Sequence, residues 1–238
     1  DETAKIIDGF SQMYPFIKKY EVFQFRPDLI AIGGRVAALL NLALSKLEKN
    51  TDIIVKLDAD LRFDKKFIQD ILAEFTNHKE LGIASGTLVQ DDKVEVVNYT
   101  SSMTRGATMF VKKEVFELTG GFFVSKGNGE DTLLSVAARY FGWRTRSFPI
   151  YFHHLKPEGF RTRSLSVAWQ TGFYKGAIPY INRYFFLTLI FHLKSKPFVL
   201  NSFIQLIGFI YSKYIVKYRP FPGYVAIQLK KEHKESFN

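Results

Sequence analysis

Short apolar segments alternate with helix-like segments along the first 155 or so residues of the chain, and this alternation constrains the fold most. Apolar runs of about four to eight residues are typical of strands, whereas apolar residues three and four apart are typical of helices. Strands are expected at 22–25, 52–57, 81–89, 105–111 and 145–152, and helices at 3–20, 35–49, 65–77, 113–119 and 131–141. Strands separated by helices predict an α/β fold with a mainly parallel sheet.

The composition is that of a folded, cysteine-free chain. Hydrophobic residues make up 47% of its 238 residues, enough for one large domain or one domain with an appendage. Charged residues make up 24%, which argues against extensive disorder. Because the chain has no cysteine, disulfides, thiolate metal sites and a cysteine nucleophile are excluded.

Positive charge is concentrated in the last third of the chain. Residues 164–238 contain ten Lys and Arg and two Glu, a balance of +8, whereas residues 1–163 carry a balance of +2. We therefore expect a nearly neutral core at 1–163 and a basic helical region at 164–238. A basic region attracts an anionic partner, either a phospholipid surface or nucleic acid.

The basic region is also rich in apolar residues. Its two apolar runs, 184–191 and 198–210, are both shorter than the about 20 residues that cross a bilayer, and Lys194, Lys196 and Pro197 separate them. Such runs predict amphipathic helices that lie on an anionic membrane surface. A helical hairpin packed on the core is the alternative.

Asp58 and Asp60, in the triplet Asp58-Ala59-Asp60, follow directly after the apolar run 52–57. The carboxyl end of a buried strand is where α/β sheets place their ligands. Two carboxylates with no basic residue beside them suit Mg²⁺ or Mn²⁺, and such an ion commonly bridges the phosphates of a nucleotide. The alternative is that Asp58 caps a turn and Asp60 is solvated.

Glu130 and Asp131 open the predicted helix at 131–141, directly after Gly127-Asn128-Gly129. Glycines allow a sharp turn, and the helix dipole favours negative charge at this end. A carboxylate in this position could accept a proton from a hydroxyl. The alternative is a plain helix cap with an acidic first turn.

Two further pairs of side chains are candidates for metal or phosphate binding. His153 and His154 end the last predicted strand and point to opposite faces, so one of them could bind a metal. Arg161 and Arg163 lie in the glycine-containing segment 157–163, where guanidinium groups could bind phosphate oxygens. The alternative for the histidines is a structural role, and the alternative for the arginines is contact with a membrane or with solvent.

The order of these motifs resembles that of the family 2 glycosyltransferases, which are inverting enzymes with the A-type glycosyltransferase fold. The shared motifs are Asp58-Ala59-Asp60, the segment 105–116, Gly120-Gly121-Phe122, Gly129-Glu130-Asp131, Gly142-Trp143 and His153-His154. The resemblance covers roughly residues 1–185 and implies a Rossmann-like, mainly parallel sheet. Asp1-Glu2-Thr3 resembles the end of the family's Asp-Gly-Ser-x-Asp-x-Thr turn, which implies an N-terminally truncated chain that lacks its first strand.

The resemblance implies a role for each candidate residue. Asp58 and Asp60 would hold Mg²⁺ or Mn²⁺ and the sugar nucleotide, with Asp60 the more direct metal ligand. Asp131, beside Glu130, matches the general base, and His153, in preference to His154, matches a histidine near the metal or the diphosphate. The other implied residues are Arg35, Asn41, Arg161 and Arg163 on the nucleotide side, and Gly106 and Trp143 on the acceptor side.

The implied function is metal-assisted transfer of a sugar, with inversion, from a nucleoside-diphosphate sugar to an acceptor hydroxyl. The expected setting is cell-surface polysaccharide or glycolipid synthesis at the cytoplasmic face of the cell membrane, with a glycan or lipid-linked acceptor and no nucleic acid. One alternative is a non-catalytic scaffold of the same fold. The other is a basic nucleic-acid-binding protein, whose binding would fall steeply with salt.

Overall fold

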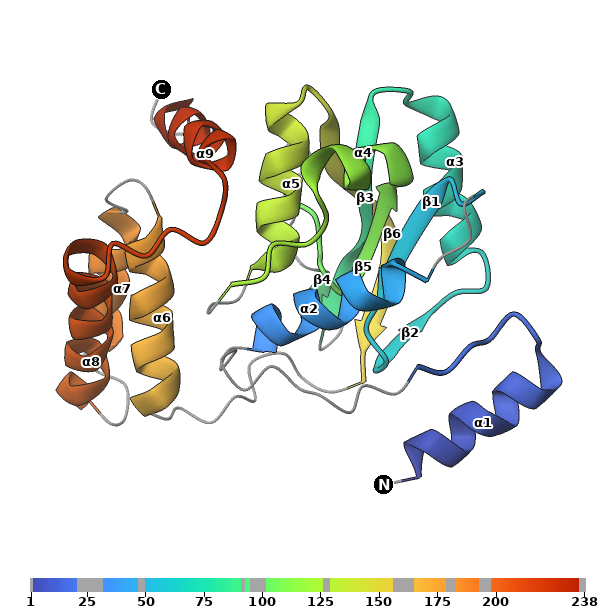
Figure 1. The fold of residues 1–238 in the computed structure, drawn as a ribbon, viewed down its shortest axis with the longest axis horizontal. Coiled ribbons are helices and arrows are strands. Elements are labelled where there is room, and N and C mark those ends of the chain that lie inside the picture. The colour runs from blue at the N-terminus through green and yellow to red at the C-terminus, as the bar shows by residue number, and fades with distance from the viewer. Residues whose placement is uncertain are drawn as a thin grey trace.

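The computed structural model describes residues 2–20, 32–46, 50–90, 93–94, 102–125, 129–155, 165–178, 183–192 and 198–235. In this part of the chain, a six-stranded sheet lies between helices, and a separate group of helices lies beside it (Figure 1). The strands are β1 (Ile53–Leu57), β2 (Leu61–Phe63), β3 (Leu81–Gln90), β4 (Lys93–Val94), β5 (Thr108–Lys112) and β6 (Arg144–His154). The helices are α1 (Thr3–Met13), α2 (Ile32–Leu44), α3 (Phe67–Asn77), α4 (Lys113–Thr119), α5 (Glu130–Tyr140), α6 (Leu165–Ala177), α7 (Arg183–His192), α8 (Phe198–Ile210), the π-helical turn η1 (Tyr211–Ile215) and α9 (Gly223–Glu235).

The α/β architecture is as the sequence predicts, but the prediction of a mainly parallel sheet is wrong. The strand order is β1-β5-β3-β6-β2, with β4 paired to β3. Among the described strands, β3 and β6 are parallel, and the other pairs are antiparallel. Parallel neighbours need a long crossover connection, usually a helix. The sequence between β3 and β5 has no helical pattern, and β5 returns antiparallel between β1 and β3.

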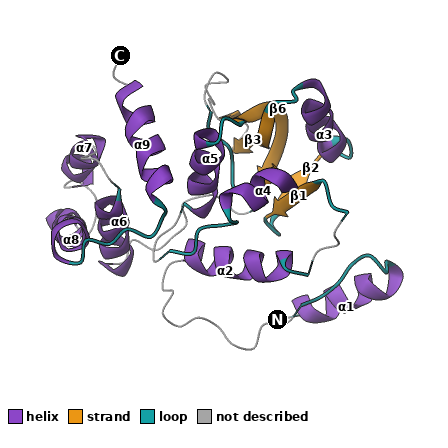
Figure 2. Ribbon diagram, turned by 45° about the horizontal axis from the view of Figure 1, so that its top comes forward, coloured by secondary structure: helices purple, strands orange, loops and turns teal. Residues whose placement is uncertain are grey.

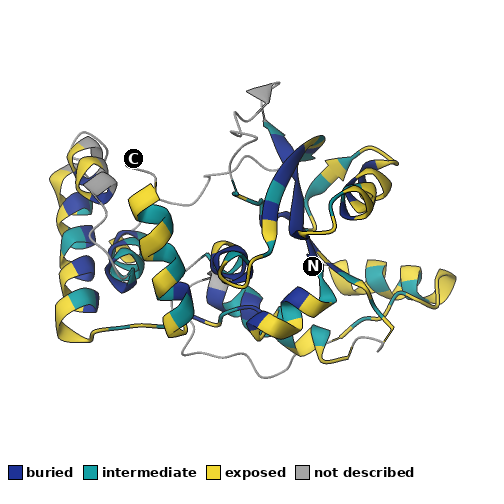
Figure 3. Ribbon diagram, turned by 90° about the horizontal axis from the view of Figure 1, so that it is seen from above, coloured by how far each residue is buried: buried dark blue, intermediate teal, exposed yellow. Residues whose placement is uncertain are grey.

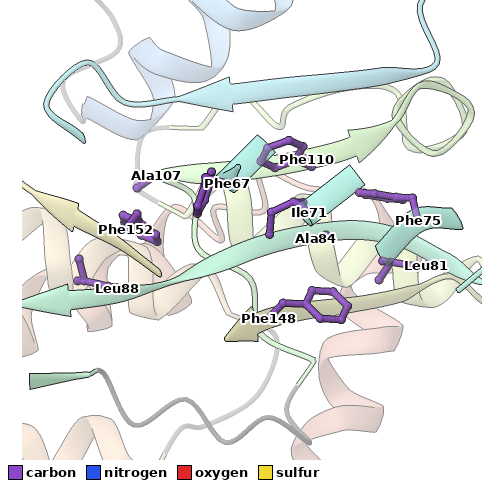
Figure 4. Packing of buried hydrophobic residues seen from close by; sticks show 10 residues of the cluster. All are labelled: Phe67, Ile71, Phe75, Leu81, Ala84, Leu88, Ala107, Phe110, Phe148 and Phe152. Carbon is purple, nitrogen blue, oxygen red and sulfur yellow. The ribbon is translucent and has the colours of Figure 1, made fainter. Parts of the chain in front are cut away.

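Helix α3 covers one face of the sheet. Its side chains Phe67, Ile71 and Phe75 are four residues apart and buried, because they share one side of the helix. The Phe67 ring lies 6.3 Å from that of Phe110 on β5 and 6.2 Å from that of Phe152 on β6, measured between centroids. This aromatic cluster fixes the helix to the sheet (Figure 4).

Helices α2, α4 and α5 cover the other face. Ala37, Val115 and Leu134, one from each helix, pack on Ile83 and Met109 of the sheet. Residues 133–138 of α5 are all buried, so this helix is covered on every side along that stretch. Figure 3 shows buried residues along the strands, whereas the outer helices carry exposed faces. Helix α5 begins at Glu130, so its packing fixes the position of the predicted base.

The last helix, α9, packs on the core as well. Phe221 and Val225 bury against α5. The Arg139 guanidinium donates to both oxygens of Glu232, at 2.6 and 2.8 Å. Burial acts to raise the pKa of Glu232, but the hydrogen bonds and charge of Arg139 outweigh it and hold the pKa below its ordinary value.

Helices α6, α7 and α8 form a group of their own beside α9 (Figure 2). A methyl group at Gly172 on α6 would overlap the Gln205 carbonyl on α8, and one at Gly208 would lie 2.6 Å from the Trp169 carbonyl. Glycines therefore permit this close approach of two helix backbones, as small residues do in membrane helix pairs. In the described part of the chain, no helix combines the length and the apolar character that spanning a bilayer requires.

The N-terminal helix α1 ends at Met13, earlier than the predicted helix 3–20. None of its residues is buried, and Ile6, Phe10 and Met13 are about half exposed or more. The predicted strand 22–25 lies outside the described residues.

Candidate active site

The candidate residues gather at one edge of the sheet. β1, β3 and β6 run in the same direction, because β1 and β3 are each antiparallel to β5 and β6 is parallel to β3. Asp58 follows the carboxyl end of β1, and His154 ends β6. Gly106 precedes the amino end of the antiparallel β5, which lies at the same edge. The sheet therefore brings together motifs that are about fifty residues apart in sequence.

Asp58 is held by a lysine that the sequence analysis did not single out. Lys56 Nζ donates to Asp58 Oδ1 at 2.8 Å and to the Gly106 carbonyl at 2.5 Å. The Asp58 N–H donates to the Ala107 carbonyl at 3.0 Å. The expectation that the two carboxylates have no basic neighbour is thus wrong for Asp58. The available signal was a lysine inside an otherwise apolar strand.

Asp131 lies directly against Gly106. A methyl group on Gly106 would overlap the Asp131 carboxylate at Oδ2. The other carboxylate oxygen, Oδ1, accepts from the Thr132 N–H at 2.7 Å. The residue in the N-cap position is Gly129, with φ of 102°, so Asp131 is not the cap of this helix. Its Oδ2 faces the loop that Lys56 links to Asp58.

Glu130 lies beside this cluster with a perturbed ionisation. Burial raises the pKa of Glu130 above its ordinary value of 4.5, and the charge of Asp131 raises it further. The hydrogen bond from the Gly129 N–H, at 3.1 Å, and the charge of Lys56 act in the opposite direction. A carboxyl group next to a candidate base is therefore partly protonated at a higher pH than usual.

Asp60 has a different partner from Asp58. Its Oδ1 lies 3.5 Å from Nδ1 of His154, and its carbonyl accepts from the Leu155 N–H at 2.8 Å. The structure thus brings His154, rather than His153, to Asp60, because successive strand residues point to opposite faces.

The oxygens of Asp58 and Asp60 fit a divalent ion that also binds phosphate. In the described residues, no three His, Asp or Glu side chains form a complete metal-binding cluster. Mg²⁺ is usually held by one or two carboxylates together with substrate phosphates and water. Asp58 and Asp60 are carboxylates of the kind that such a donor set includes.

Asn41 connects α2 to the backbone of Phe122. Its amide donates to the Phe122 carbonyl at 2.8 Å and accepts from the Phe122 N–H at 3.0 Å. It thereby fixes α2 to the Gly120-Gly121-Phe122 turn. Arg35 lies near the start of the same helix, where a methyl group on Gly34 would overlap the carbonyl of Ser125, just before the Gly-Asn-Gly loop.

Trp143 lies at the opposite edge of the sheet from Asp58. It packs against Gly82 at the start of β3, and Lys112 Nζ at the end of β5 lies 4.6 Å from its ring centroid. The structure does not bring it to the other candidates. Arg161 and Arg163 lie outside the described residues.

The helix group reaches the site through Tyr174. A methyl group on Gly129 would lie 2.7 Å from the hydroxyl oxygen of Tyr174 on α6. Gly129 directly precedes Glu130, so α6 forms one wall beside the acidic pair. No motif in the sequence predicts this contact, because it joins residues that are far apart along the chain.

No protein-family model and no curated protein sequence matches the chain. Among solved structures, it is similar to the mannosyltransferase PcManGT from Pyrobaculum calidifontis in complex with GDP-Man and Mn²⁺, with a TM-score of 0.55 and 15% identity. The match covers 100% of this chain and 63% of that one, so the chain spans less than two thirds of the mannosyltransferase's length. This similarity shows that the chain shares its fold with part of that mannosyltransferase.

Proposed function

We propose that the chain transfers a sugar from a nucleoside-diphosphate sugar to an acceptor hydroxyl, with inversion at the anomeric carbon. One observation carries the proposal: Asp131 lies against Gly106, whose carbonyl shares the Lys56 ammonium with Asp58. A base and a phosphate-side carboxylate are thereby held on two sides of one short loop. An inverting transfer requires this pairing, because the base and the leaving group lie on opposite faces of the sugar.

Asp131 acts as the general base in this proposal. As the acceptor oxygen forms its bond to the anomeric carbon, the bond from that carbon to the diphosphate oxygen breaks, and the diphosphate leaves with the electron pair. The acceptor hydroxyl proton passes to Oδ2 of Asp131. Proton transfer to a positioned carboxylate typically contributes about 10²–10⁴-fold to the rate.

Asp58, Asp60 and His154 form the diphosphate side. A divalent ion bound there supplies Lewis-acid stabilisation of the departing phosphate oxygen. Asp60 is the principal oxygen donor, since one oxygen of Asp58 already accepts from Lys56. Arg161 and Arg163 are proposed as further phosphate contacts, and Arg35 as a contact on the nucleotide side.

The fold supports this assignment, since the similar mannosyltransferase was solved with GDP-Man and Mn²⁺. The motif order that resembles the family 2 glycosyltransferases supports it independently. The test is to incubate the protein with Mn²⁺ and a panel of nucleoside-diphosphate sugars that includes GDP-mannose, and to measure released nucleoside diphosphate. A non-catalytic scaffold would bind a donor without releasing nucleoside diphosphate.

We also propose that α7 and α8 attach the protein to an anionic membrane surface on its cytoplasmic side. These helices expose large apolar side chains, among them Phe186, Ile190, Leu200, Phe203, Ile207 and Ile210. The surrounding region 164–238 carries the +8 charge balance. Because α6 of the same group lies against Gly129, a surface-bound enzyme would present its acidic pair near the lipid headgroups. A lipid-linked or membrane-bound glycan acceptor suits that arrangement.

A further inference from the structure

Lys56 is a buried cation inside a strand. Alternation along β1 places Ile54 and Lys56 on one face, and both residues are buried. Lys56 pairs in register with Met109, which packs on the face covered by α5. The residue is 8% exposed. A buried ammonium is costly unless it is paired and hydrogen-bonded, so a lysine in this position calls for specific partners.

Its partners belong to both halves of the candidate site. The ammonium donates to the carboxylate of Asp58 and to the backbone carbonyl of Gly106. The Asp131 carboxylate lies on that same Gly106. The Lys56 charge also lowers the pKa of Glu130, against the raising effect of burial. Lys56 therefore contacts Asp58 and the loop at Gly106 through hydrogen bonds. Its charge also acts on Glu130, the neighbour of the proposed base.

We propose that Lys56 is a positioning residue and internal counter-ion, which holds Asp58 and the Gly106 loop together and limits the negative charge that Asp58 and the nearby Asp131 place at this edge of the sheet. The inference rests on the proposed function. Without a positive charge beside them, the carboxylates of Asp58 and Asp131 would repel an anionic diphosphate. The lysine offsets one of these charges, so the site favours the metal together with the diphosphate over the metal alone.

Charge and packing roles make opposite predictions for metal affinity. If Lys56 only filled space, its replacement would loosen the site and weaken Mn²⁺ binding. If it is a counter-ion, its neutralisation makes the site more negative, and Mn²⁺ alone binds more tightly. A unit charge acting on a divalent ion across a few ångströms is worth about tenfold even with strong solvent screening.

The experiment is a calorimetric titration of the whole chain with Mn²⁺ alone, and then with GDP or UDP in the presence of saturating Mn²⁺. Lys56→Gln retains a donor but removes the charge, and Lys56→Arg retains the charge. Lys112→Gln is the matched control, because Lys112 lies at the opposite edge of the sheet, where it donates to the Lys79 carbonyl. A thermal melt of each variant reports folding.

We expect Lys56→Gln to bind Mn²⁺ about tenfold more tightly and the nucleoside diphosphate more weakly, with Lys56→Arg and Lys112→Gln close to the wild type for Mn²⁺. Unchanged or weaker Mn²⁺ binding by a folded Lys56→Gln would overturn the inference. If Lys56→Gln does not fold, Lys56→Met removes the same charge and is judged by the same outcomes. These readouts need no turnover, so failure of Lys56 as a counter-ion is distinguishable from failure of sugar transfer.

Discussion

The Asp131 carboxylate and the Cα of Gly106 are in direct contact, and a side chain on Gly106 would occupy the position of Asp131 Oδ2. Gly106 is buried, and its carbonyl accepts from Lys56. Position 106 therefore requires glycine, because the Asp131 carboxylate occupies the space that a side chain would need. The hydrogen bond from Lys56 holds the Gly106 backbone in place. Gly106 thus lies between the proposed base, Asp131, and the lysine that holds Asp58 on the proposed phosphate side.

Gly106→Ala tests this relationship. The added methyl group must displace Asp131, and a misplacement of about 1 Å can cost about 10²-fold in rate. We expect kcat to fall by about that factor with a small change in donor affinity. Gly223→Ala is the control, because no atom lies within 4 Å of a methyl group there. Equal turnover by the two variants would show that Asp131 is not held in place by Gly106.

The neighbouring histidines provide a matched pair for the metal site. His154 Nδ1 lies 3.5 Å from Asp60 Oδ1. We expect His154→Gln to weaken Mn²⁺ binding by about tenfold or more, whereas His153→Gln leaves it close to the wild type. Mn²⁺ titration with a thermal melt of each variant measures this. If His153→Gln weakens Mn²⁺ binding more than His154→Gln does, His153 is the histidine nearer the metal.

The Arg139–Glu232 pair predicts a pH-dependent attachment of α9. The pKa of Glu232 is lowered in the folded chain, so the pair contributes stability above the ordinary value of 4.5 and loses it as pH falls through the folded pKa. We expect Glu232→Gln to cost about 1.5–3 kcal/mol at pH 7 and progressively less below about pH 4.5. Urea unfolding at several pH values measures the difference, with Glu235→Gln as the exposed control. A cost that does not vary with pH would contradict the ionic contribution.

The exposed apolar side chains of α8 predict binding to anionic vesicles. Each basic residue near an anionic surface contributes about 1 kcal/mol, which salt weakens, while apolar burial resists salt. We expect co-sedimentation with anionic rather than neutral vesicles, reduced but not abolished at high salt. Replacing both Phe203 and Ile207 by Gln should reduce it strongly, whereas Leu72→Gln on α3 should not. If the protein does not bind anionic vesicles, the membrane proposal is wrong, and the exposed apolar face of α8 is better explained as a contact with another protein.

The sequence predicted the elements that local pattern determines. Helix α4 begins and ends where expected, and α3, α5 and β1 agree to within two residues. The direction of β5 was not predictable from the alternation, because direction depends on which strands pair and not on periodicity. The short strand β2 was not predicted either, because its three residues form a strand only through their pairing with β6.

The site was predictable where a motif is contiguous in the sequence and not where it depends on folding. Asp58, Asp60, Glu130 and Asp131 were identified from their spacing. The contacts of Lys56 and Tyr174 arise because β1, β5 and α6 meet only in three dimensions. The hydrogen bonds between the Asn41 amide and the backbone of Phe122 are likewise not visible in any sequence spacing.

The central claim is that Asp131 removes the acceptor proton during sugar transfer. The most direct measurement is the rate of nucleoside-diphosphate release with Mn²⁺, a nucleoside-diphosphate sugar and an acceptor for the wild type, Asp131→Asn and the exposed control Asp70→Asn. Because asparagine keeps the shape but cannot accept the proton, Asp131→Asn should lower kcat by about 10²–10⁴-fold with little change in donor KM. Near-normal turnover by Asp131→Asn, or no metal-dependent release by the wild type with any donor in the panel, would contradict the account.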